Sequence, residues 1–183
     1  MRNNKEIKLH LGCGKRFIPE FTHHIDARKF PHVDYVASVD KLKMFKKNSV
    51  DLIYACHLLE HFKRNQTESV LKEWHRVLKP GGILRLAVPD LDQLIRVYQK
   101  TKDLKLILGP LVGRQDYPEN THYMIFNYKL LSEFLKNVGF KKIHRYDWRK
   151  TVHKDYDDFS QAYIPHMDKE HGILISLNVE AKK

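Results

Sequence analysis

The sequence predicts a doubly wound α/β fold, in which parallel strands form one sheet and helices pack against it. Two observations carry this prediction. Short apolar runs of strand length alternate with amphipathic helical patterns, and a glycine turn follows the first run in LHLGCG (9–14). The chain has 183 residues, the length of a single domain, and we take residues 1–183 as that domain.

Seven strands are expected. The first has its apolar residues at alternate positions, Ile7, Leu9 and Leu11, which is typical of a strand. The second is short and ends in an acid at Asp26. The expected strands span residues 7–11, 22–26, 33–38, 51–56, 83–88, 142–148 and 172–180.

Three segments have the apolar spacing of amphipathic helices. The first spans 66–78, and Pro80-Gly81-Gly82 should end it and turn the chain into the next strand. The third has Asn127 as a predicted N-cap and Gly139 as its C-terminal stop. The apolar positions of the three helices are Val70, Leu71, Trp74, Val77 and Leu78; Leu91, Leu94, Ile95 and Tyr98; and Leu130, Leu131, Phe134, Leu135 and Val138.

The turn at Gly12 and Gly14 is typical of a site for a nucleoside-containing cofactor. Glycine has no Cβ, so the backbone amides can approach a ligand and a positive φ costs little. Asp26, at the end of the next strand, is placed to accept hydrogen bonds from ribose hydroxyls. A dinucleotide is disfavoured because Phe17 stands where its fingerprint needs a third glycine, and no P-loop sequence follows. A cofactor without phosphates, S-adenosylmethionine above all, fits better.

Five stretches together resemble a known family: LHLGCG (9–14), HHID (23–26), NSVDLIYACHLLEHF (48–62), EWHRVLKPGGILRLAVPD (73–90) and NVGF (137–140). In this order they resemble the class I S-adenosylmethionine-dependent methyltransferases. The similarity is greatest to the small bacterial type 11 group, which is often associated with surface-polysaccharide genes. The resemblance implies a Rossmann-like doubly wound sheet, mostly parallel with an antiparallel last strand, and S-adenosylmethionine as cofactor.

The resemblance also indicates which residues hold the cofactor. Two positions depart from the family pattern near the glycine turn: His10 stands where many relatives carry an acid, and Lys15-Arg16 replaces a small residue. At the end of the third strand Ser38 stands at the position of a family acid. Either this serine weakens the adenine contact or Asp40 replaces it. The expected cofactor-binding residues are Leu11, Gly12, Cys13, Gly14, Asp26, Ser38, Val39, Asp40, Cys56 and His57.

The methyl acceptor is expected to bind between segments 103–124 and 149–170, which interrupt the strand–helix alternation and face the substrate in the resembled family. The catalytic candidates are His122, His57 and Asp90. His122 lies in a segment expected to cover the site, and a neutral histidine is a suitable base near physiological pH. Asp90 follows the fifth strand at the cofactor edge, and His57 should approach the methionine end of the cofactor.

Four other polar residues lie in or near these segments, and we expect two of them on the acceptor side and two in structural roles. Tyr123 and His153 are further candidates on the acceptor side, whereas Glu60 and His61 are interpreted as structural parts of their turn. No metal site is predicted, because the acidic residues around Asp158 match no metal-binding loop.

The composition limits the cellular setting and the partners. A net charge of +11 permits nucleic acid, a membrane surface or an acidic substrate as partner, but the lysines are scattered and no nucleic-acid-binding motif is present. No apolar run is long enough for a transmembrane helix, and MRNNKEIKLHLGCG lacks the apolar region of a signal peptide. Cys13 and Cys56 are expected to be free thiols in a reducing cytoplasm.

These observations lead to one leading hypothesis and two alternatives. The leading one is a cytoplasmic S-adenosylmethionine-dependent methyltransferase that acts on a hydroxyl or amine of a small molecule or sugar. An RNA or protein methyltransferase is the first alternative: the net charge favours it, whereas the Ala-Cys-His-Leu sequence after the fourth strand lacks an amino-methylation signature. A non-catalytic binding protein that retains the fold is the second, permitted by His10 and Ser38.

Overall fold

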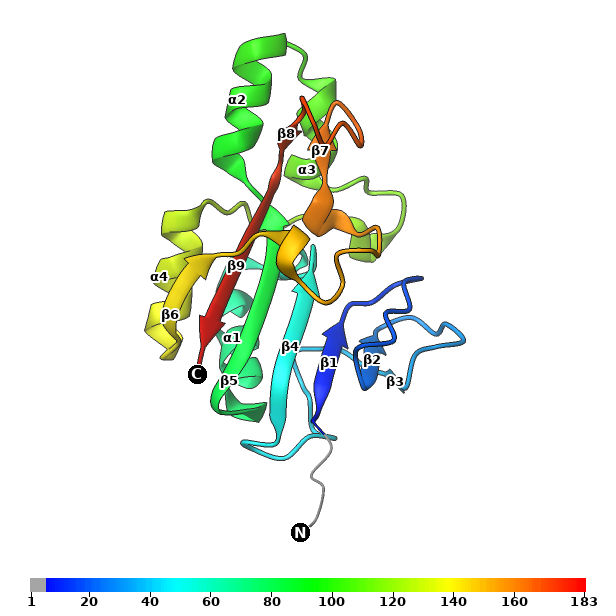
Figure 1. Ribbon diagram of the computed structural model, residues 1–183, viewed down its shortest axis with the longest axis vertical. Helices are drawn as coiled ribbons and strands as arrows, with labels where there is room; N and C mark the ends of the chain where they lie inside the picture. Colours follow the sequence, from blue (N-terminus) through cyan, green and yellow to red (C-terminus); the bar gives the residue numbers. More distant parts are fainter. Residues whose placement is uncertain (1–5) are drawn as a thin grey trace.

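The computed structural model describes residues 6–183, and its centre is a seven-stranded sheet (Figure 1). The strand order is β3-β2-β1-β4-β5-β9-β6. Strands β1 to β5 pair in parallel, and β9 runs antiparallel to both of its neighbours. This confirms the predicted mostly parallel sheet with an antiparallel last strand. The strands are β1 (Lys8–Leu11), β2 (His23–Asp26), β3 (Tyr35–Val36), β4 (Val50–Cys56), β5 (Leu78–Pro89), β6 (Lys141–Arg145) and β9 (Ser176–Lys182).

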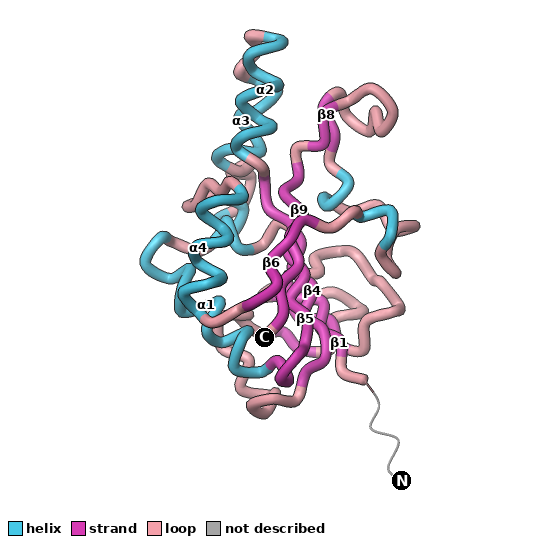
Figure 2. Tube along the Cα trace, turned by 60° about the vertical axis from the view of Figure 1, so that its left-hand side comes forward, coloured by secondary structure: helices cyan, strands magenta, loops and turns pink. Residues whose placement is uncertain are grey.

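Helices and loops cover different faces of this sheet. Figure 2 shows α1 and α4 on one side and loops with short 3₁₀ turns on the other. The helix predicted over 66–78 is α1, and Asn127 caps α4 as expected by accepting a hydrogen bond from the Leu130 amide. The helices are α1 (Arg64–Val77), α2 (Leu91–Thr101), α3 (Lys105–Val112) and α4 (Tyr128–Val138), and the 3₁₀ turns are η1 (Leu59–His61), η2 (Pro118–Asn120), η3 (Trp148–Lys150) and η4 (Phe159–Gln161).

Alternate residues of the central strands enter the two layers, as the period of a strand requires. Leu9 and Leu11 of β1 belong to the large apolar core beneath α1 and α4. His10, between them, points to the loop-covered face and packs near Phe21 and Tyr54. The sheet is therefore buried on both faces although helices cover only one.

A third layer of contacts lies beyond the carboxyl ends of the central strands, where α2, α3 and the hairpin of β7 (Tyr163–Ile164) and β8 (Ile173–Leu174) gather (Figure 1). Ile107 of α3 packs there with Leu94 and Val97 of α2. No helix within residues 6–183 combines the length and apolarity needed to cross a bilayer. The prediction of no signal peptide falls partly on residues 1–5, which lie outside the described residues.

Several elements differ from the sequence-based expectations: the strand expected over 172–180 is divided into β8 and β9, and β6 and β3 end earlier than the strands expected over 142–148 and 33–38. Segment 103–124, which we read as irregular, contains α3, with Pro110 inside it. Gly109-Pro110 indicated a break, but the packing of Ile107 against α2 outweighs this local preference. Strand β5 also begins earlier than expected, at Leu78, and Pro80-Gly81-Gly82 forms an irregularity within it where the pairing with β4 shifts register.

Candidate active site

The glycine turn after β1 is held by the chain itself. Gly12 and Gly14 have φ values of 63° and 56°, which glycine adopts without strain. The Gly12 amide donates to the Ile25 carbonyl at 2.8 Å, and the Gly14 amide donates to Asp26 Oδ2 at 2.7 Å. Both predicted amide donors therefore already have partners. The turn can therefore admit a ligand mainly because glycine has no side chain, and not because its amides are free to donate.

The space around the two glycines differs. A Cβ built on Gly12 would lie 2.7 Å from Cδ1 of Leu58, so Leu58 fills that position. A Cβ on Gly14 would meet only the guanidinium of Arg28, at 3.9 Å. The turn is closed on the side of β4 and open at Gly14. The neighbouring Leu11 and Cys13 side chains are buried, and burial raises the pKa of the Cys13 thiol to about 12, so only their backbone can meet a cofactor.

Asp26 lies at the end of β2, beside the glycine turn, as predicted. Its Oδ2 accepts the Gly14 amide and its Oδ1 accepts the Arg28 amide at 2.8 Å. Each carboxylate oxygen can accept a second hydrogen bond, so the fixed carboxylate can still receive the two hydroxyls of a ribose.

Arg28 is a neighbour of this site that sequence reasoning missed. Its guanidinium stacks over Tyr117 at 4.5 Å and lies 5.3 Å from the ring centre of Phe30. Tyr117 belongs to the segment predicted to face the acceptor. Because Arg28 Nε also lies 3.6 Å from Asp26 Oδ1, the cation–π contact links that segment to Asp26 through Arg28.

Arg16 links the second predicted acceptor segment to the glycine turn. Its Nε donates to the Asp157 carbonyl at 2.9 Å, and its guanidinium lies 4.6 Å from the ring centre of Phe159. The His57 ring lies 5.3 Å from the same phenylalanine. Phe159, half exposed, is thus a second neighbour of the site that the sequence did not single out.

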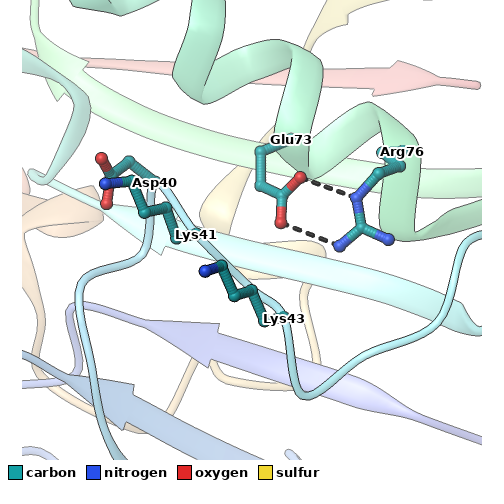
Figure 3. Close-up of a pocket in the computed structure, with 5 residues that line it drawn as sticks. All are labelled: Asp40, Lys41, Lys43, Glu73 and Arg76. Atoms are coloured by element: carbon teal, nitrogen blue, oxygen red, sulfur yellow. Dashed lines mark hydrogen bonds and ion pairs between the residues drawn. The ribbon is translucent and has the colours of Figure 1, made fainter.

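Three of the predicted cofactor-binding residues, Ser38, Val39 and Asp40, follow β3 and differ in what they contact. Ser38 Oγ donates to Asp40 Oδ1 at 2.5 Å, so the two residues that we treated as alternatives are bonded to each other. The Val39 side chain is buried in the core. Asp40 also lines a pocket of about 340 Å³ against α1, where Glu73 and Arg76 form an ion pair at 2.7 Å (Figure 3). That pocket is built around a structural ion pair.

Strand β4 delivers Cys56 and His57 to the same edge. His57 has a φ of 48°, unusual for a residue with a side chain and common at functional sites. Its Nε2 lies 3.1 Å from Ser176 Oγ and its Nδ1 3.5 Å from Glu60 Oε1. Burial, with His122 and His61 nearby, lowers the pKa of His57 to about 3, so its ring is neutral. Burial also raises the pKa of the Cys56 thiol.

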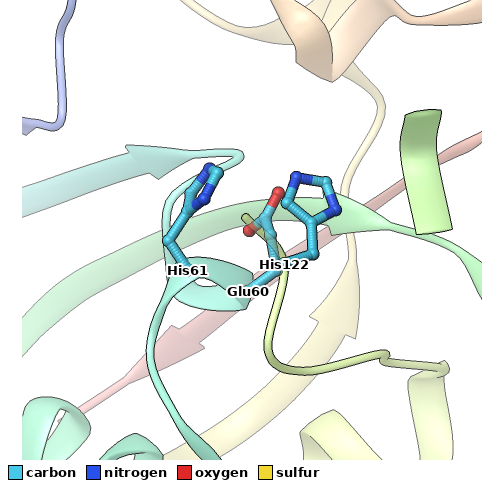
Figure 4. A group of neighbouring side chains, drawn as sticks. All are labelled: Glu60, His61 and His122. Carbon is cyan, nitrogen blue, oxygen red and sulfur yellow. The ribbon is translucent and has the colours of Figure 1, made fainter. Parts of the chain in front are cut away.

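Next to His57, three side chains converge: Glu60 and His61, which are adjacent in the sequence, and His122, which lies 62 residues after Glu60 (Figure 4). The Tyr123 amide, next in the chain to His122, donates to the Glu60 carbonyl at 2.8 Å. The rings of His61 and His122 are 4.8 Å apart. His122 therefore does lie at the carboxyl end of β4, whereas the Tyr123 side chain is exposed.

The protonation states of this cluster follow from burial. Burial raises the pKa of the Glu60 carboxyl to about 8, and among residues 6–183 neither of its oxygens has a hydrogen-bond partner. Burial, together with His61, lowers the pKa of His122 to about 4. At neutral pH the histidine is uncharged, and it is a weaker base than an ordinary histidine.

Asp90 lies on the same sheet edge but is engaged elsewhere. Its Oδ1 accepts the Asp92 amide and caps α2, and its Oδ2 accepts Arg145 at 3.0 Å. The side chain is fully buried. These contacts show that Asp90 has a structural role. Its catalytic role remains a prediction.

The loop-covered face holds the remaining candidates. His153 is fully buried there, with its ring 4.2 Å from that of Tyr54, whose hydroxyl donates to Asp158 Oδ2 at 2.5 Å. His10 lies in the same layer, and burial, with His24 and His153 nearby, lowers its pKa to about 3. His10 therefore cannot supply the negative charge of the acid that relatives carry.

Taken together, the edge formed by β1, β2 and β4 fits S-adenosylmethionine. Gly14 provides an open approach, Asp26 provides two oriented acceptor oxygens, and the rings of His57 and Phe159 lie 5.3 Å apart beyond the end of β4. The Gly12–Leu58 contact holds the turn against the β4 end.

Comparison with known proteins agrees with this geometry. Residues 13–86 match a family model described as a methyltransferase domain. No curated protein matches the chain.

Solved structures resemble the whole fold. An S-adenosylmethionine-dependent methyltransferase from Archaeoglobus fulgidus shares 14% identity, covering 97% of this chain and 86% of that one, with a TM-score of 0.60. A methyltransferase from Thermotoga maritima, described as a possible histamine N-methyltransferase, shares 14% identity over 97% and 82%, with a TM-score of 0.59. The 1,6-didemethyltoxoflavin-N1-methyltransferase of Burkholderia thailandensis, crystallised with its substrate and S-adenosylhomocysteine, shares 16% identity over 97% and 70%, with a TM-score of 0.60. At these identities the likeness establishes the fold.

Proposed function

Because the chain is a class I S-adenosylmethionine-dependent methyltransferase, matched over residues 13–86 to the methyltransferase-domain family, we propose that it methylates a hydroxyl or amine of a small molecule or sugar. One observation carries the proposal: the acceptor segments are tied directly to the cofactor edge, one by Arg28–Tyr117 and the other by Arg16–Asp157. These contacts support an acceptor position near the edge of the sheet that carries Asp26 and His57.

The protein's main task in this reaction is positioning. S-adenosylmethionine, when bound, supplies a methyl group already activated on a sulfonium. Holding the acceptor in line with such a group is worth up to about 7–11 kcal/mol. Asp26 orients the ribose end, and Leu58 fixes the glycine turn against the end of β4.

His122 is the residue we propose to receive the acceptor proton. Its Nδ1 lies 2.9 Å from the Pro110 carbonyl, so this nitrogen donates and Nε2 carries the free lone pair. A positioned base contributes on the order of 10²–10⁴ in rate. His122→Ala should therefore lower turnover and leave the affinity for S-adenosylmethionine unchanged.

The test has two stages. Isothermal titration of S-adenosylmethionine and S-adenosylhomocysteine into the purified protein should show micromolar binding of both. Transfer of a labelled methyl group to a panel of sugars, nucleotide-sugars and small amines would then identify the acceptor class. Absence of cofactor binding at millimolar concentration would contradict the proposal and favour a binding protein that retains the fold.

The net charge of +11 keeps RNA as a second candidate acceptor. Phosphate contacts make binding fall steeply with salt. Salt-insensitive or absent RNA binding would remove this candidate. We place the reaction in the cytoplasm, a proposal that the two free thiols, Cys13 and Cys56, support.

A further inference from the structure

The Glu60 carboxyl group is a buried polar group of the candidate site whose contact with His57 is a long one, 3.5 Å from Oε1 to Nδ1. Its side chain is fully buried and neither oxygen has a hydrogen-bond partner within the described part of the chain. Buried carboxylates in proteins are paired or coordinate metal ions. The Glu60 carbonyl, by contrast, accepts two amides, from Tyr123 and Met124, so the backbone at this position is fixed.

The two histidines beside Glu60 are oriented in the manner of metal ligands. His61 Nδ1 lies 3.1 Å from the Thr121 carbonyl, and His122 Nδ1 lies 2.9 Å from the Pro110 carbonyl. Since a carbonyl only accepts, both Nδ1 atoms are donors and both Nε2 atoms carry lone pairs. An imidazole whose other nitrogen donates to a backbone carbonyl is the usual arrangement of a metal-binding histidine.

The spacing of the three groups suits one small ion. One ligand atom from each of Glu60, His61 and His122 lies within 4.8 Å of the other two. Ligand bonds of 2.0–2.1 Å in a tetrahedral site place ligand atoms about 3.4 Å apart. Binding an ion therefore requires the side chains to move closer together, while the two backbone segments are already joined by the hydrogen bonds from the Tyr123 and Met124 amides to the Glu60 carbonyl.

We propose that Glu60, His61 and His122 bind one divalent first-row transition-metal ion at the carboxyl end of β4. Two imidazoles and one carboxylate suit Zn²⁺, Co²⁺, Fe²⁺ or Mn²⁺ more than Ca²⁺ or Mg²⁺. Three protein ligands leave at least one coordination position open. Both histidines are partly exposed, so that position is reachable.

The location connects the ion to the acceptor side of the site. Leu58, two residues before Glu60, packs on Gly12 of the cofactor turn. With an ion bound, His122 Nε2 is a ligand and no longer the base that it is in the metal-free protein, and the ion assists loss of the acceptor proton instead. The open position would take an oxygen of the methyl acceptor, which favours a hydroxyl over an amine. This consequence rests on the proposed methyltransferase function, whereas the metal site itself does not.

Cobalt binding tests the site without any assay of activity. Titration of the metal-free protein with Co²⁺, followed by visible absorption and by calorimetry, should give one equivalent with the ligand-field bands of a low-coordinate nitrogen–oxygen site. Glu60→Gln and His122→Ala should each weaken binding roughly 100-fold, at least the effect of losing a hydrogen bond to a ligand. His171→Ala, which removes a highly exposed histidine, should bind Co²⁺ like the wild type.

The outcomes separate this inference from the proposed function. Circular dichroism of each variant shows whether it is folded, and Glu60→Gln keeps the shape of the side chain. Absence of Co²⁺, Zn²⁺ and Mn²⁺ binding by the wild type, or equal binding by folded Glu60→Gln, would overturn the metal site whatever S-adenosylmethionine does. Metal binding without S-adenosylmethionine binding would leave the site standing and contradict the proposed function alone.

Discussion

Replacement of His10 by phenylalanine should make the protein markedly more resistant to acid. The His10 ring lies in the loop-covered layer, 5.4–5.5 Å from the rings of Phe21, Tyr54 and His24. Its Nδ1 is buried without a hydrogen-bond partner, so a phenyl ring of similar size loses no polar contact of that atom. At pH 7 the variant should be at least as stable as the wild type.

The magnitude follows from the pKa of His10 in the folded protein. Burial, with the positive charges that His24, His153 and Arg16 can carry, lowers this pKa from 6.5 to about 3. Between these values the unfolded chain binds a proton at His10 and the folded protein does not, so stability falls as the pH falls below 6.5. At pH 4.5, two units below 6.5, His10 alone should remove about 2.7 kcal/mol from the free energy of unfolding.

Urea unfolding at pH 7.0 and pH 4.5 measures this effect. The loss of free energy of unfolding between the two values should be about 2.7 kcal/mol smaller in His10→Phe than in the wild type. His171→Ala, a change at an exposed histidine, should reproduce the wild-type loss. An equal loss in wild type and His10→Phe would refute the reasoning, because it would show that His10 titrates normally in the folded protein.

Three further predictions concern the sheet edge. Asp26→Asn should raise the dissociation constant of S-adenosylmethionine about five- to 150-fold, the effect of about 1–3 kcal/mol from unpaired buried groups; an unchanged constant in calorimetry would show that the ribose is held elsewhere. Gly12→Ala should lower the melting temperature more than Gly14→Ala, since both have positive φ but only the Gly12 Cβ meets Leu58, and adding Leu58→Ala should restore part of the loss. Asp90→Ala should cost about 1–2 kcal/mol of stability through the cap of α2 and leave cofactor affinity intact; a fully stable but inactive variant would instead indicate a catalytic role.

The positions of most strands and of the main helices could be predicted because the sequence repeats its pattern locally. The apolar face of 66–78 and the caps Asn127 and Gly139 lie within a turn or two of the residues they organise. Helix α3 could not be predicted this way. Gly109 and Pro110 oppose a helix locally, and what stabilises it is Ile107 packing on a neighbouring helix.

In the candidate site, too, the residues fixed by local sequence could be predicted, and those brought together by distant contacts could not. Gly12, Gly14 and Asp26 were predictable because each sits at the end of a strand, and the carboxyl ends of adjacent parallel strands meet at one edge. The meeting of Glu60 with His122 was not, since it depends on a backbone hydrogen bond between the Glu60 carbonyl and a loop 60 or more residues away. For that reason LLEHF was interpreted as structural only.

The departure at His10 has a physical explanation that bears on the choice between an enzyme and a binding protein. The acid of relatives is expected to help hold the glycine loop, and His10 is neutral and faces the other layer. In this chain the loop is held by the Ile25 carbonyl on Gly12 and by Asp26 on Gly14. Since two other groups fix the loop, the loss of an acid at position 10 does not remove the cofactor site, and the main sequence argument for a non-catalytic protein loses its force.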